Sequence, residues 1–418
     1  MASLTSLPPE LQMHTVHLTS DSQPDLAVTL EEPAQNNEAF TETVLLILCL
    51  LSSWGPAGNE AGTSCRGIRL ILSAASPTDA IDSHGFKRRH RKVRWERSCI
   101  GFLVNRPRDL PVSCLVSTFS CTALKTFRNF SLAAICAIAS CLPNVHTLDW
   151  GLGDLERHGI ARGVEMREEF AKGLMELPRN VRHFALKFDR GVPLNHHWSP
   201  PQLYHGDPAV PDPLSVSLRY LMQRLETLEV KNDTIIGSEI FWPSSSTDPG
   251  SHNNGPVEFL NLRHVVVCAG IVSPCGSWLC SEDPSVGAVQ PPNVNPLNDD
   301  VVPGDEGEAM FRLKYLPGLV EPYHLAAACA ASRMPRLNNL EIMWSSPRPA
   351  CLEYIVRDCG AQATLKFYGS LPLELTGSSE KAWREAAKVH VGDENSLDMN
   401  FIDEGNNWQP PETRTLRT

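Results

Sequence analysis

The sequence lacks a hydrophobic run long enough to cross a membrane. The run from Val44 to Leu51 holds only eight consecutive apolar residues, whereas a spanning helix needs about 20. Glu38 and Glu42 precede this run, and a Trp-Gly-Pro turn follows it. We expect a buried segment at 44–51, with a membrane or cleaved segment as the alternative, and no association of the protein with a membrane.

A disulfide framework is also missing. The chain has 13 cysteines, an odd number, and they extend from Cys49 to Cys359 without a repeated short spacing. The segment from Met1 to Glu10 lacks the basic stretch of a secretory signal. We therefore expect free thiols and a reducing compartment, the cytoplasm, the nucleus or both.

Sequence motifs of common enzymes are absent as well. The chain contains no GxxxxGK[ST] or GxGxxG loop for phosphates and no GxSxG nucleophile elbow. Carboxylates are scattered, and no two have a spacing that indicates a general acid and general base pair. We predict no catalytic residue, no cofactor and a protein that is not an enzyme.

One group of cysteines bears on metal binding. Cys268, Cys275 and Cys280 lie close together in the sequence, and the only neighbouring histidines are His252 and His264. A closed zinc site needs four ligands at conventional spacing, so we expect buried or loop thiols and no metal. A metal-binding or enzymatic protein that uses these groups is the alternative function.

A second polar group follows in a proline-rich stretch. His196 and His197 are adjacent, and His205 and Asp207 come shortly after them. Segments of this composition usually lie at the surface, and we interpret these side chains as polar residues of a surface loop.

The charge is unevenly distributed. The net charge is −11, from 37 Lys and Arg against 48 Asp and Glu, but residues 87–108 alone carry +8, so the remainder carries −19. Such an acidic body argues against nucleic-acid binding. The basic run 87–97 is a solvated loop, a nuclear-import signal or, least favoured, a nucleic-acid patch beside Trp95. Its charged residues are Lys87, Arg88, Arg89, Arg91, Lys92, Arg94 and Arg97.

Internal repetition is the main structural signal. Five segments share the pattern apolar, two variable, apolar, one variable, apolar, which ends in the alternation of a strand. They are 145–150, 181–186, 225–230, 262–267 and 337–342. Their first positions are 36, 44, 37 and 75 residues apart.

Helical stretches precede most of these segments. Ser131–Cys141, Arg167–Leu177 and Leu325–Met334 each lead into a proline, and Pro213–Arg224 has leucines at helical spacing. Proline cannot continue a helix and disfavours helical geometry in the preceding residue. Helix, sharp exit and strand therefore form one recurring αβ unit.

We predict an α/β fold, an irregular leucine-rich-repeat-like αβ solenoid with a poorly ordered N-terminal region. An ordinary open α/β sheet is the alternative. The repeat domain is expected at 119–392, with disordered insertions at 244–256 and 281–309 and a terminal unit and cap at 353–389. Residues 13–118 are expected to be mostly irregular, including loops at 14–40 and 52–112, and 393–418 to form a C-terminal strand and tail.

Two parts of the sequence resemble a known family. The segment Ser6-Leu7-Pro8-Pro9-Glu10-Leu11-Gln12 is similar to the opening of an F-box, a module that docks on the adaptor subunit of cullin–RING ubiquitin ligases. After Gln12 the F-box pattern stops, so 1–12 is an F-box remnant, truncated or reshuffled, or the next residues are translated non-coding sequence. Residues 120–392 resemble uncharacterised fungal F-box proteins with a leucine-rich-like region, through 212–219, 225–228, 241–243, 334–337, 340–344 and 382–386.

The resemblance implies a non-enzymatic protein-interaction role like that of the substrate-receptor part of an F-box subunit. The adaptor would dock on Leu7, Pro8, Glu10 and Leu11, and a substrate of unknown identity would bind elsewhere. Candidate contact residues near strand ends are Trp150, Trp242 and Trp344, because aromatic side chains dominate binding hot spots. The alternative for these tryptophans is that they fill the core between repeats.

Overall fold

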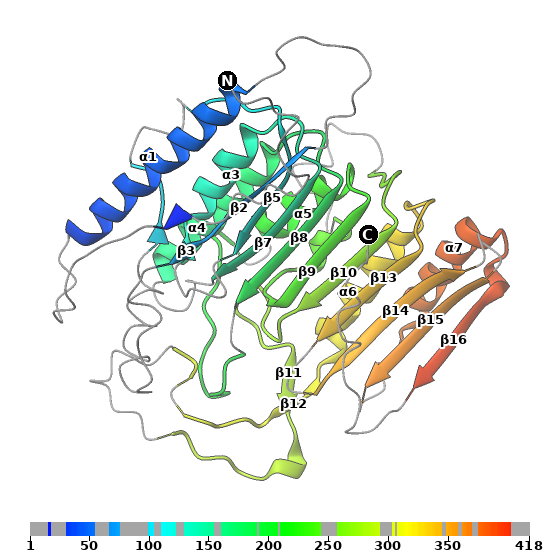
Figure 1. Cartoon of the computed structure of the whole chain (residues 1–418). Helices are drawn as coiled ribbons and strands as arrows, with labels where there is room; N and C mark the ends of the chain where they lie inside the picture. The colour runs from blue at the N-terminus through cyan, green and yellow to red at the C-terminus, as the bar shows by residue number, and fades with distance from the viewer. Residues whose placement is uncertain are drawn as a thin grey trace. The chain divides into compact units, whose positions relative to one another are not determined.

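The protein is a mixed α/β protein whose strands are mostly parallel (Figure 1). The computed structural model describes residues 16–17, 31–54, 67–75, 99–103, 110–122, 129–153, 160–189, 192–207, 210–243, 257–292, 303–305, 307–344, 348–357, 362–369 and 375–402. The chain divides into two compact units. The first comprises Met1–Leu155 and Lys172–Asp189, and the second comprises Glu156–Ala171 and Arg190–Thr418.

The first unit contains a parallel sheet in the strand order β2-β5-β7-β8. The strands are β2 (Ile68–Leu72), β5 (Val116–Thr122), β7 (Thr147–Gly153) and β8 (His183–Asp189). Short parallel pairs join β1 (Val16–His17) to β3 (Ala74–Ala75) and β4 (Cys99–Ile100) to β6 (Asn129–Phe130). Trp150 lies at the centre of the core, 5.3 Å from Phe184 and 6.2 Å from Phe119 between ring centroids.

Helices α1 (Glu31–Ser53) and α3 (Leu132–Ser140) belong to the same unit. One face of α1 is buried through Phe40, Val44, Leu48 and Leu51, whereas Leu46 is 70% exposed. The apolar run at 44–51 therefore belongs to an amphipathic helix. The expectation of a buried segment is wrong for Leu46 and Leu50, which lie on the exposed face. In the described part of the chain, no helix has the length and apolar character needed to span a bilayer.

The second unit contains a mixed sheet in the order β9-β10-β13-β14-β15-β16. Strands β9, β10 and β13 are parallel, β14 is antiparallel to both β13 and β15, and β16 is parallel to β15. Their bounds are β9 (Thr227–Thr234), β10 (His264–Ala269), β13 (Asn339–Trp344), β14 (Ala350–Arg357), β15 (Gln362–Gly369) and β16 (Leu397–Ile402).

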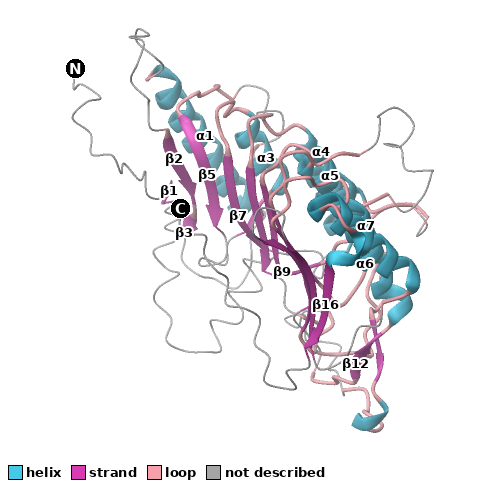
Figure 2. Cartoon of the chain, turned by 90° about the vertical axis from the view of Figure 1, so that its right-hand side faces the viewer, coloured by secondary structure: helices cyan, strands magenta, loops and turns pink. Residues whose placement is uncertain are grey.

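Three helices of this unit, α5 (Pro213–Met222), α6 (Pro317–Ala331) and α7 (Gly377–Val391), lie on one side of its sheet (Figure 2). Aromatic contacts fix two of them. Tyr323 of α6 packs edge-on against Trp344, and Trp383 of α7 lies 5.0 Å from Tyr354 between ring centroids. Helix α4 (Ile160–Met175) has residues in both units.

Local sequence explains where these helices begin and end. Asp212 caps α5 and Pro213 occupies its first turn, which is the preferred N-terminal combination. Thr376 caps α7, and Gly392 ends it with a left-handed backbone at φ 86°. These local signals set where the two helices begin and where α7 ends.

A small antiparallel arm projects near the carboxyl ends of β9 and β10 (Figure 1). It consists of β11 (Cys280–Glu282) and β12 (Arg312–Tyr315), with a 3₁₀ turn at Pro284–Val286. An ion pair of 2.9 Å between Arg348 and Asp283 ties the arm to the start of β14.

The structure corrects three expectations about irregular segments. The loop expected at 14–40 is wrong from Glu31 onward, because α1 begins there and its apolar face packs. The expectation of a loop at 52–112 is wrong for 68–72, which form the short strand β2. Pairing with β5 stabilises this strand. The insertion expected at 281–309 begins as the β11 arm, whereas 244–256 lies outside the described residues.

Candidate functional site

The second unit has one sheet surface that its helices do not cover. Side chains alternate between the two sides of a strand, and Trp344, Tyr354 and Phe367 point toward the helices. On each strand, the residues that alternate with these helix-facing ones form the opposite surface, which we call the open face. Its central row, aligned by strand register, is Glu229, Val266, Glu341, Glu353, Lys366 and Asn400.

The open face carries two carboxylates in direct opposition. Glu341 on β13 pairs in register with Glu353 on β14, and like charges placed opposite each other across antiparallel strands are unfavourable. Neighbours offset part of this repulsion. Asn339 donates to Glu341, and Tyr368 donates to Glu353 over 3.0 Å, while the Lys366 ammonium lies 3.8 Å from the same carboxylate.

A third carboxylate of the row, Glu229, forms an ion pair of 2.5 Å with Lys231. Both side chains keep 17–19% of their surface exposed. The central row therefore contains three carboxylates and one ammonium, with a further ammonium on the same strand. It is a polar surface with an excess of negative charge, in which Val266 is buried and Glu229, Glu353 and Lys366 keep 19–21% of their side-chain surface exposed.

The row beside it, toward the carboxyl ends of β10 and β13, is more apolar. It is formed by Cys268, Met343, Cys351, Tyr368 and Ile402. Burial raises the pKa of the Cys351 thiol well above its usual range, and Glu341 and Glu353 add to the shift. This thiol is neutral and therefore a poor nucleophile.

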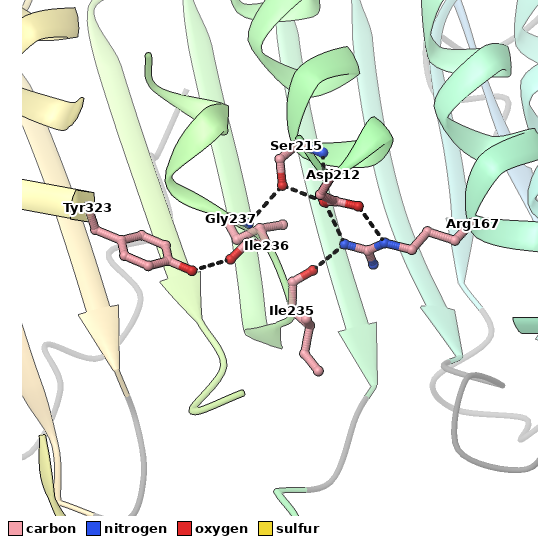
Figure 3. A network of polar contacts seen from close by, with 7 residues as sticks. All are labelled: Arg167, Asp212, Ser215, Ile235, Ile236, Gly237 and Tyr323. Atoms are coloured by element: carbon pink, nitrogen blue, oxygen red, sulfur yellow. Dashed lines mark hydrogen bonds and ion pairs between the residues drawn. The ribbon is translucent and has the colours of Figure 1, made fainter. Parts of the chain in front are cut away.

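A buried polar network lies at the carboxyl end of β9 (Figure 3). The Arg167 guanidinium donates to both carboxylate oxygens of Asp212 over 3.0 and 2.8 Å and to the carbonyl of Ile235 over 2.6 Å. Asp212 also accepts from the backbone N–H and hydroxyl of Ser215. The network thus joins α4, the start of α5 and the turn after β9.

The network continues toward α6. The Gly237 N–H donates to the Ser215 hydroxyl over 2.8 Å, and the Tyr323 hydroxyl donates to the Ile236 carbonyl over 2.5 Å. Burial, with the nearby carboxylates, raises the pKa of Tyr323, so it remains a neutral donor. Because these groups are buried and satisfied by one another, the network positions helices and offers no reacting group to a ligand.

The sequence-predicted contact tryptophans differ in position. Trp150 and Trp344 have no exposed surface, and Trp242 is half-buried. The burial favours the core-filling alternative for Trp150 and Trp344, because each ring is enclosed by other aromatic residues. The adaptor-docking residues Leu7, Pro8, Glu10 and Leu11 and the basic run from Lys87 to Arg97 lie outside the described residues.

The cysteine group is not brought together as a site. Cys268 and Cys280 are buried, and burial raises the pKa of Cys280 to about 12. Cys275 instead occupies a tight turn, where its thiol is hydrogen-bonded to Ser273 and Ser277. Among the residues that the structure describes, no three or more His, Cys, Asp or Glu side chains are grouped to hold a metal ion.

The expectation of a surface position is wrong for His196. This side chain is fully buried, and its Nδ1 accepts hydrogen bonds from the backbone N–H groups of Phe311 and Arg312 over 3.0 and 2.8 Å. His196 therefore anchors the β12 end of the arm. His205 is exposed and pairs with Glu168 over 2.8 Å.

Sequence reasoning missed both the Arg167–Asp212 pair and the open-face row. The Asp-Pro dipeptide at 212–213 is a helix-start signal that pointed to Asp212, but nothing in the sequence pairs it with an arginine 45 residues earlier. The open face could have been found from the variable positions of the repeat, such as Glu229 and Glu341, because they alternate with the buried apolar positions.

Comparison with known proteins gives one match. Residues 324–410 match the model of a family of unknown function, DUF6546. The described part of this segment runs from α6 through β13, β14, β15 and α7 to β16. No curated protein and no solved structure matches the chain.

Proposed function

We propose that this chain is a non-enzymatic interaction protein that holds a protein partner on the open face of its second unit. The observation that carries the proposal is the one-sided packing of α5, α6 and α7 (Figure 2). The sheet surface opposite them is polar and partly exposed. Aligned side chains on a rigid sheet offer many contacts at a small entropic cost. A binding role needs such a surface and no catalytic group.

An αβ solenoid architecture is part of the proposal. In each unit, strands of the repeat lie next to each other in parallel, as β7 and β8 do in the first unit and β9, β10 and β13 do in the second. Leucine-rich-like repeats stack in this way and bind partners through their strand-lined surface. The antiparallel strand β14 ends the series after β13.

The facing carboxylates indicate the chemistry of the partner. Glu341 and Glu353 oppose each other across the centre of the open face, and a Lys or Arg of the partner would relieve their repulsion on binding. The proposed partner surface is therefore basic at the point that meets these residues.

A role as the substrate receptor of a cullin–RING ligase extends the proposal. In this role, Leu7, Pro8, Glu10 and Leu11 would dock on the adaptor subunit, and the open face would hold the substrate. The basic run 87–97 would direct part of the protein to the nucleus. Leu7→Asp should then abolish recovery of the adaptor without changing recovery of the substrate.

Affinity purification of the full tagged chain from its source cells, followed by mass spectrometry, tests the proposal. The Glu341→Lys/Glu353→Lys variant should lose the main partner by at least about tenfold, since charge reversal turns attraction into repulsion. Glu385→Lys, at an exposed carboxylate of α7, is the matched control and should retain it. The same partners at the same yield from the reversed variant, with its fold intact by circular dichroism, would refute the open face as the binding surface.

A further inference from the structure

The strand β16 forms the edge of the second unit's sheet. Its side chains at 398, 400 and 402 lie on the open face, but the backbone edge that faces away from β15 is a separate surface. Its six residues pair with β15 in unbroken parallel register, from Ala363 opposite Leu397 to Tyr368 opposite Ile402. Within the described part of the chain, no strand pairs with its other side. Every second residue of such an edge directs its backbone N–H and C=O outward, which is the template for one more strand.

The edge lacks three of the devices that usually block strand addition, and its one charged residue is Asp398. Proteins protect edges with proline, lysine or a β-bulge. The sequence of β16, Leu-Asp-Met-Asn-Phe-Ile, contains no proline and no lysine, and its register has no irregularity. An extended segment could therefore pair along its whole length.

Two side chains define what such a segment should carry. Phe401 stacks on Phe367 with 4.9 Å between centroids and 11° between planes. It lies on the helix side of the sheet and still exposes 56% of its surface. Asp398 is exposed on the opposite side and accepts a hydrogen bond of 3.0 Å from Asn400. Among the described residues, no cation lies within ion-pair distance of its carboxylate.

We propose that β16 binds an extended segment of a partner protein as an added strand. The segment places an apolar side chain against Phe401 and a Lys or Arg beside Asp398. Positions three apart on a strand face opposite sides, so the segment carries its basic and apolar residues three positions apart. Backbone hydrogen bonds supply affinity and these two side chains supply selectivity. This inference does not depend on the function proposed for the open face.

Fluorescence polarisation with synthetic octapeptides tests it on the purified full chain. The peptides alternate Thr and Val and carry either Lys or Glu at one position and either Leu or Ser three positions away, in both orders so that both strand directions are sampled. The wild-type chain should prefer the Lys and Leu peptides. Phe401→Lys should weaken their binding by at least about tenfold, because the apolar contact is lost.

Asp398→Lys should reverse the preference from Lys to Glu. Leu260→Lys, at a leucine that is 53% exposed, and Glu385→Lys are the matched controls and should bind as the wild type does. The open-face variant Glu341→Lys/Glu353→Lys should also bind as the wild type does, so the two proposals fail separately. Circular dichroism checks that each variant is folded.

Three results would overturn the proposal. The first is a wild-type chain that binds the Lys and Glu peptides equally or binds none of them. The second is a Lys preference that survives Asp398→Lys. The third is self-association of the wild-type chain that Phe401→Lys abolishes, because a second copy would then occupy the edge.

Discussion

Arg167 and Asp212 form a two-bonded ion pair although their side chains are only 3% and 2% exposed. Removing both charges from water is costly, and the pair persists because every bond that either group needs is supplied nearby. Arg167 also holds the Ile235 carbonyl, and Asp212 caps α5. One pair thus fixes three backbone segments.

Arg167→Ala should lower the free energy of unfolding by about 3–5 kcal/mol, because Asp212 is left buried without a countercharge. Urea denaturation followed by tryptophan fluorescence measures the change. Arg384→Ala, which breaks an exposed pair with Glu380 on α7, is the control and should cost no more than about 0.5 kcal/mol. Equal effects of the two substitutions would contradict the structural role of the network.

The stability of the second unit should fall as the pH falls from about 6.5 to about 4. Burial lowers the pKa of both His196 and His324 to about 4 from an ordinary value of 6.5. In this window the unfolded chain binds protons that the folded chain does not, so the free energy of unfolding decreases by up to about 1.4 kcal/mol per pH unit for each histidine.

His324→Leu should make this pH slope shallower, as measured by urea denaturation at several pH values. His324 lies between Trp344 and Phe367, and neither ring nitrogen has a hydrogen-bond partner, so leucine should also be tolerated at neutral pH. His146→Leu, at an exposed position of the first unit, is the control. If the free energy of unfolding depends on pH as steeply in His324→Leu as in His146→Leu, His324 is not a buried neutral imidazole.

Glu341→Gln should raise the free energy of unfolding by about 0.2–1 kcal/mol, because it removes the repulsion with Glu353 and keeps an oxygen for Asn339. Thermal unfolding in low salt measures the gain, and added salt should reduce it. Glu385→Gln on α7 is the comparison. A loss of stability in Glu341→Gln would mean that the two carboxylates do not repel each other.

The inner face of α1 should respond to truncation, whereas the outer face should not. Leu48 is 1% exposed and Leu46 is 70% exposed on the same helix. Leu48→Ala should cost about 2–5 kcal/mol by leaving a cavity, and Leu46→Ala should stay within about 0.5 kcal/mol. Similar costs for both, in urea denaturation, would contradict the packing of α1.

The repeat pattern was the most informative part of the sequence. The five apolar segments all contain strands, β7, β8, β9, β10 and β13, because alternation on a half-buried surface is a local property that the chain itself encodes. The helices that precede them also formed, since the prolines and caps that bound them are local signals. The α/β class followed from these two observations.

The remaining features depend on contacts between distant residues. The reversal of direction at β14 comes from pairing with β13 and β15, and its apolar pattern is the same in either direction. The Arg167–Asp212 pair and the burial of His196 join residues 45 and 115 positions apart. The start of α1 at Glu31 was missed because its polar first turns hide the packed face.

Hydroxyl-radical footprinting of the full chain, alone and with its captured partner, tests the central claim most directly. Met343 and Tyr368 are half-buried on the open face, and a partner bound there should lower their oxidation. Met175, which is 52% exposed, should be oxidised equally in both samples. Unchanged oxidation of Met343 and Tyr368 in a complex of verified stoichiometry would contradict the open face as the binding surface.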